Sequence, residues 1–161
     1  MMNAEFTQWL PDGLLVILGL VLLAAAIIDV RTYTIPNWLN LAVALLALLF
    51  WWAIALPLWP DAAIRLGVAF AVFALLALAF YLGMMGGGDV KLAAALALWF
   101  PPLATVKLLV IMSFAGGVLT LIMILVHRAG RKEGRPKIPY GVAIAVGGWA
   151  ILAERYLNHF A

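Results

Sequence analysis

The chain has 161 residues, of which 68% are apolar and 11% charged, and its mean hydropathy is +1.15. Water-soluble domains are about 45–50% apolar and about 25% charged, so this composition excludes an ordinary soluble domain. The formal net charge of +3 gives no reason to expect nucleic acid as a partner. Cysteine is absent, which excludes disulfides, thiol nucleophiles and cysteine-bound zinc.

The apolar segments predict an all-α, polytopic integral membrane protein with six transmembrane helices in a single domain, residues 1–161. A membrane-spanning helix takes about 20 apolar residues, and prolines, glycines and charged residues divide the chain into suitable segments. The expected helices cover residues 13–28, 38–56, 64–82, 90–100, 103–126 and 140–157. The fourth helix is short. Residues 1–12 are expected to form an exposed end, and most tryptophans are expected to lie at the membrane interface.

The lysines and arginines indicate the orientation. Alternating crossings place seven of the ten basic residues on one face, which is therefore expected to be cytoplasmic, with the N-terminus outside. The cytoplasmic set is Arg31, Lys91, Arg128, Arg131, Lys132, Arg135 and Lys137, and the outer set is Arg65, Lys107 and Arg155. The basic segment 128–137 is expected to interact with anionic membrane lipids.

Two acidic residues lie at helix ends on the same predicted face. Asp29 follows the first helix and Asp89 precedes the fourth, and two complete crossings between them return the chain to the cytoplasmic side. An ionisable residue at membrane depth indicates a functional site. The alternative is a boundary role, with Asp29 paired to Arg31 and Asp89 capping its helix. The glycines before Asp89 allow close backbone approach, which suits a site for an extended peptide.

Two neighbouring carboxylates can hydrolyse a peptide bond, with one as general base toward water and the other as general acid toward the carbonyl oxygen. Like charges a few Å apart cannot both persist, so such a pair shares one proton. Neither a metal nor a cofactor is expected, because no metal-binding motif occurs. A second hypothesis is a small transporter or channel subunit in which Asp29 and Asp89 relay protons or bind a cation.

Three segments in order resemble the motifs of type IV prepilin peptidases. They are DVRTYTIPN at residues 29–37, GMMGGGDVK at residues 83–91 and PKIPYGVAIAVGG at residues 136–148. The second contains the GxGD signature of intramembrane aspartyl proteases, formed here by Gly86, Gly88 and Asp89. The resemblance implies an inner-membrane endopeptidase of bacteria that uses Asp29 and Asp89 to remove the short basic leader from prepilins and pseudopilins at the cytoplasmic face.

Larger members of that family also carry a cysteine-containing insertion and methylate the new N-terminus. This chain has no cysteine and a short connection after its first helix, so no separate methyltransferase domain is expected. The compact form resembles the peptidases of Flp-type, tight-adherence pilus systems, which implies small Flp-type prepilins as substrates.

Three polar residues close to the aspartates are expected to support the site. Arg31 and Lys91 are interpreted either as membrane anchors or as contacts for an acidic residue near the start of the mature pilin. Asn37, like Asn40, is expected to cap the second helix and is also placed to orient Asp29.

Overall fold

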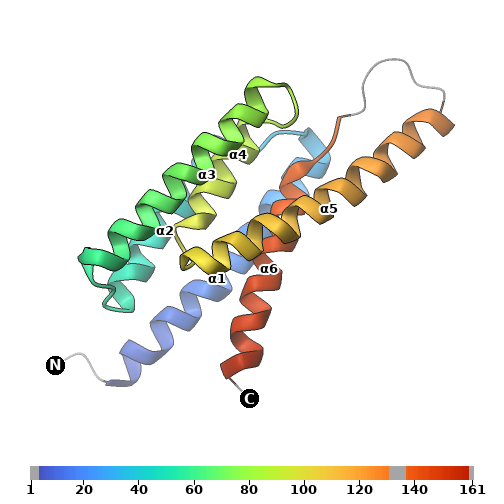
Figure 1. The fold of residues 1–161 in the computed structure, drawn as a ribbon. Coiled ribbons are helices and arrows are strands. Elements are labelled where there is room, and N and C mark those ends of the chain that lie inside the picture. The colour runs from blue at the N-terminus through green and yellow to red at the C-terminus, as the bar shows by residue number, and fades with distance from the viewer. Residues whose placement is uncertain (1–3, 131–136, 160–161) are drawn as a thin grey trace.

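The computed structural model describes residues 4–130 and 137–159, and all regular structure in these two ranges is helical. The elements are α1 (Ala4–Thr32), α2 (Asn37–Ala53), the short segment η1 (Leu58–Ala62), which is kinked at Trp59, α3 (Ala63–Tyr81), α4 (Gly87–Ala97), α5 (Pro102–Ala129) and α6 (Tyr140–His159). Figure 1 shows them as a bundle of elongated helices with both chain ends at one end of the bundle. The all-α prediction is confirmed.

Three stretches are long and apolar enough to cross a membrane, namely Trp9–Thr32, Leu58–Tyr81 and Pro102–Ala129. The outward surface of α3 and α5 is lined with large apolar side chains, which suits lipid and not water. On α3 the exposed residues include Ile64, Leu66, Phe70, Phe73, Leu75, Leu78 and Phe80, and on α5 they include Val106, Val110, Phe114, Val118, Leu121 and Leu125. The chain is therefore a helical membrane protein.

Helix α4 lies at the centre of the bundle. It contacts α2, α3 and α6, while α1 packs between α2 and α6, and α5 packs mainly on α6. Its buried residues are Asp89, Val90, Leu92, Ala93, Ala95, Leu96 and Ala97. With 11 residues, α4 is about 16 Å long, so it covers about half of a hydrocarbon core of about 30 Å. Helix α5 is much longer and projects beyond its neighbours (Figure 1).

Two helix starts differ from the prediction. Helix α1 begins at Ala4 and continues through Pro11, its eighth residue, although a proline beyond the first turn removes one backbone hydrogen bond of the helix. Helix α4 begins at Gly87 and not at residue 90, with Gly86 as the N-cap. The glycine run was expected to lie outside the helix. It enters the first turn because the backbone N–H groups there need no partners within the helix.

The predicted start of α2 also needs correction. Pro36 occupies the N-cap position, and Asn37 is the first helical residue. Neither position carries a side-chain capping bond. Proline suits this place because its extended ψ of 142° leads into a helix without needing an N–H.

Three tryptophans bind helices together and are not simple interfacial anchors. The indole of Trp99 is 1% exposed and donates to the Val43 carbonyl at 3.0 Å. Trp51 donates to Leu98 O at 2.8 Å, and Trp149 donates to Gly19 O at 3.0 Å. These bonds fasten the end of α4 to α2, and α6 to α1. These three indoles therefore have a structural role inside the bundle in addition to any interfacial one.

Trp99→Phe is expected to lower the free energy of unfolding by about 1–3 kcal/mol, because it leaves the buried contact to Val43 O unmade. Trp52→Phe is the matched control, since Trp52 is 62% exposed, and it is expected to change stability by less than about 0.5 kcal/mol. Thermal unfolding of both purified variants in detergent measures the difference. Equal losses for the two variants would contradict the role of the Trp99 hydrogen bond.

Candidate active site

Asp29 lies in the last turn of α1 and is 2% exposed. Its Oδ2 atom accepts a hydrogen bond of 2.7 Å from the backbone N–H of Gly141, in the first turn of α6. The bond fixes the carboxylate against α6 and is charge-assisted when Asp29 is ionised. Among the described residues, the ion pair found joins Lys107 and Glu154, so the alternative pairing of Asp29 with Arg31 is not present.

Asp89 is the third residue of α4 and is 7% exposed. Its Oδ2 accepts a hydrogen bond of 3.1 Å from the backbone N–H of Gly86, so the carboxylate does help to cap its own helix. Its Oδ1 is buried, with no hydrogen-bond partner within the described ranges. Buried polar atoms in proteins almost always have a partner. This oxygen is therefore available to a ligand or a water molecule.

The segments that carry the two carboxylates meet around Ile35, a buried residue between α1 and α2. A Cβ at Gly88 would lie 2.9 Å from the Ile35 carbonyl oxygen, and a Cβ at Gly141 would lie 2.8 Å from Ile35 Cδ1. Both glycines therefore let a helix start approach the same residue closely. The structure thus brings together the end of α1 and the starts of α4 and α6.

The Asp29 and Asp89 carboxylates are close enough for the charge of the first to act on the second. Both are buried, and burial and a like charge each oppose the ionised form. Simultaneous ionisation of both carboxyl groups is therefore disfavoured. One ionised and one protonated carboxyl group is the arrangement that general acid–base hydrolysis requires.

The other predicted site residues lie at the same end of the bundle. Lys91 Nζ donates to Asn37 Oδ1 at 2.8 Å, which links α4 to the start of α2 on the exposed surface. Asn37 is exposed and its oxygen accepts from Lys91, while the hydrogen bond to Asp29 comes from the Gly141 N–H. Arg31 is exposed in the last turn of α1. Gly86 and Gly88 have no side chain to bind with. A Cβ at Gly86 would lie 2.8 Å from Asp89 Oδ2, and a Cβ at Gly88 would lie 2.9 Å from the Ile35 carbonyl oxygen.

Two residues of the site have roles that the sequence did not predict. Gly141 supplies the backbone N–H that donates to Asp29. The one feature of the sequence that pointed to Gly141 was its place in the glycine-containing segment after Pro139. Asn40 was expected to be a cap. It is instead 5% exposed, and its Nδ2 donates to the Gly88 carbonyl at 3.2 Å.

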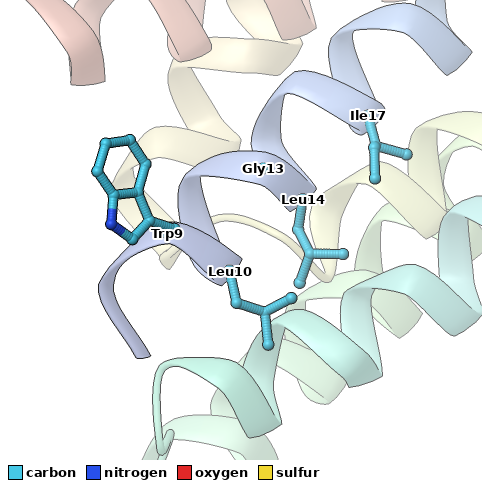
Figure 2. A pocket seen from close by; sticks show the side chains of 5 residues that line it. All are labelled: Trp9, Leu10, Gly13, Leu14 and Ile17. Carbon is cyan, nitrogen blue, oxygen red and sulfur yellow. The ribbon is translucent and has the colours of Figure 1, made fainter. Parts of the chain in front are cut away.

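Other features of the structure lie outside this constellation. No group of three His, Cys, Asp or Glu side chains that could hold a metal ion occurs in residues 4–130 and 137–159. The basic segment assigned to lipid contact falls mostly on residues 131–136, outside the described residues. Figure 2 shows an apolar hollow on α1, where Trp9 points away from Leu10 and Leu14. Its lining carries no ionisable side chain.

Comparison with known proteins agrees with the motifs. Residues 16–121 match the model of the type IV leader peptidase family. The chain is 32% identical over 149 residues to "Prepilin leader peptidase/N-methyltransferase" of Pectobacterium carotovorum subsp. carotovorum, covering 87% of this chain and 52% of the relative. It is 30% identical over 142 residues to "Type 4 prepilin-like proteins leader peptide-processing enzyme" of Escherichia coli O78:H11 (strain H10407 / ETEC), covering 84% of this chain and 49% of the relative. The chain spans about half the length of these curated relatives, and no solved structure matches it.

Proposed function

The chain belongs to the type IV leader peptidase family, and from this premise we propose that it is a membrane-embedded aspartyl endopeptidase that removes leader peptides from prepilins and pseudopilins. The observation that carries the proposal is the pair of buried carboxylates, Asp29 and Asp89, at the adjoining ends of α1 and α4. Asp89 Oδ1 adds a buried acceptor that no neighbouring group occupies within the described residues.

In the proposed reaction, one carboxylate is ionised and takes a proton from water while the water oxygen bonds to the scissile carbonyl carbon. The other carboxyl group is protonated and gives its proton to the carbonyl oxygen. Collapse of the tetrahedral intermediate breaks the C–N bond, returns the hydroxyl proton to the second carboxylate and passes the first proton to the leaving amine. The pair ends the cycle with the one proton it began with, so the reaction needs neither a metal nor a cofactor.

The proposal includes the membrane topology. Six crossings, with α4 beginning below the membrane surface, would place the N-terminus outside and the aspartates at the cytoplasmic face of the inner membrane. Figure 1 supports an even number of crossings, because both chain ends lie at the end of the bundle away from the starts of α4 and α6. Arg31 and Lys91 lie at the aspartate end, where they are positioned for contact with lipid headgroups or with an acidic residue of the substrate.

The proposed substrates are small Flp-type prepilins. The test is to reconstitute the full chain in vesicles of bacterial polar lipids with a purified Flp-type prepilin and to analyse the products by mass spectrometry. We expect a single cut between the basic leader and the apolar mature segment. An intact Flp-type precursor beside a cleaved pseudopilin would contradict the Flp-type assignment, whereas intact precursors of both kinds would contradict the peptidase function.

A further inference from the structure

Asn40 presents a buried amide to the first turn of α4. Its Nδ2 donates to the carbonyl oxygen of Gly88, the residue directly before Asp89. Only the NH₂ end of an amide can donate to a carbonyl, so this bond also fixes where the amide oxygen points. The side chain is thereby held beside the segment that carries one of the two aspartates.

The other end of the same amide has no partner. In the part of the chain that the structure describes, two buried side-chain nitrogen or oxygen atoms lack a hydrogen bond, and they are Asn40 Oδ1 and Asp89 Oδ1. Both atoms are acceptors, and they belong to residues joined through the Gly88 carbonyl. Buried acceptors without a donor are places where a ligand that donates hydrogen bonds would fit.

The amide is not needed simply to join α2 to α4. Lys91 and Asn37 already link these helices one turn away, and the Trp99 and Trp51 indoles link them at the other end of α4. An apolar residue at position 40 would pack in the same place without burying an unsatisfied oxygen. The polar side chain is therefore better explained by a partner outside the folded chain.

We propose that Asn40 Oδ1 accepts a hydrogen bond from a backbone N–H of the substrate peptide close to the scissile bond, which makes Asn40 a substrate-positioning residue. An extended peptide has such N–H groups. In a site that excludes bulk water they need acceptors from the protein. The contact would fix the register of the peptide relative to Asp89, because the same amide holds Gly88. This inference rests on the proposed endopeptidase function.

The experiment combines one protein variant with one change in the substrate. Prepilin peptides are made with a single backbone amide replaced by an ester at each position around the cut, which removes one N–H at a time. With the wild-type chain, we expect one ester position to raise KM at least about tenfold more than its neighbours do. Asn40→Leu should impose a similar penalty on the all-amide peptide, and that ester should then cost nothing further.

Two further variants separate this role from a structural one. Asn40→Asp keeps an acceptor oxygen but loses the donor to Gly88, so it should retain the ester penalty when assayed at its own pH optimum. Asn37→Leu, on the exposed surface of the same helix, should retain that penalty as well. If Asn40→Leu and the ester losses multiply at every position, the proposed contact does not exist. Failure of the wild-type chain to cleave the all-amide peptide would instead contradict the endopeptidase function itself.

Discussion

Asp29→Asn and Asp89→Asn are each expected to lower the rate of prepilin cleavage by about 10²–10⁴-fold, the range in which a general acid or base contributes. Asparagine has nearly the same shape as aspartate, but it cannot hold the proton that the pair shares. At position 29 the amide oxygen can still accept the Gly141 N–H, so the fold around α6 should be kept. Cleavage by each purified variant in lipid vesicles, scored by mass spectrometry, measures the effect.

The control for these variants is an acid far from the site. Asp61 lies in η1 and is exposed, so Asp61→Asn should leave cleavage within about twofold of the wild-type rate. Each aspartate variant must also match the wild type in yield and in thermal unfolding. Full cleavage by well-folded Asp29→Asn or Asp89→Asn protein would rule out the two-aspartate mechanism.

Much of the architecture could be predicted from composition alone. A chain with so many apolar residues is expected to form helices in lipid. Lipid offers no hydrogen bonds to the backbone, and a helix pairs its N–H and C=O groups within one segment. Prolines and charges then located most helix ends to within a few residues. The start of α4 was misplaced because the low helix propensity of glycine matters little in a first turn, where the N–H groups have no partner within the helix in any case.

The two aspartates could be singled out because the chain has only seven acidic residues, and few of these lie at helix ends on one face. Their burial beside each other depends on packing, which the motif pattern could only suggest. Gly141 could not be identified, because every residue except proline carries a backbone N–H and its partner Asp29 is 112 positions away. Asn40 was interpreted as a cap because it lies close to a helix start in the sequence. Its partner, the Gly88 carbonyl, is 48 positions away and could not be predicted.

Gly88→Ala is expected to reduce cleavage by about 100-fold. The added Cβ would lie 2.9 Å from the Ile35 carbonyl oxygen and 3.2 Å from the Ile35 nitrogen, and backbone atoms cannot rotate away. The first turn of α4 must shift, and it carries Asp89 with it. A displacement of about 1 Å near the reacting atoms can cost about 100-fold in rate. Because the collision involves the backbone, adding Ile35→Ala should not restore activity.

The adjacent glycines provide an internal comparison, since all three lie in one run before Asp89. A Cβ at Gly87 would lie 3.4 Å from the ring of Phe80, an ordinary contact, so Gly87→Ala should stay within about threefold of the wild-type rate. A Cβ at Gly86 would lie 2.8 Å from Asp89 Oδ2, so Gly86→Ala must turn the carboxylate and should fall between the other two variants. The same cleavage assay, with rates divided by the amount of folded protein, gives the order. Equal activity of the Gly87→Ala and Gly88→Ala proteins would show that close approach to Ile35 does not position Asp89.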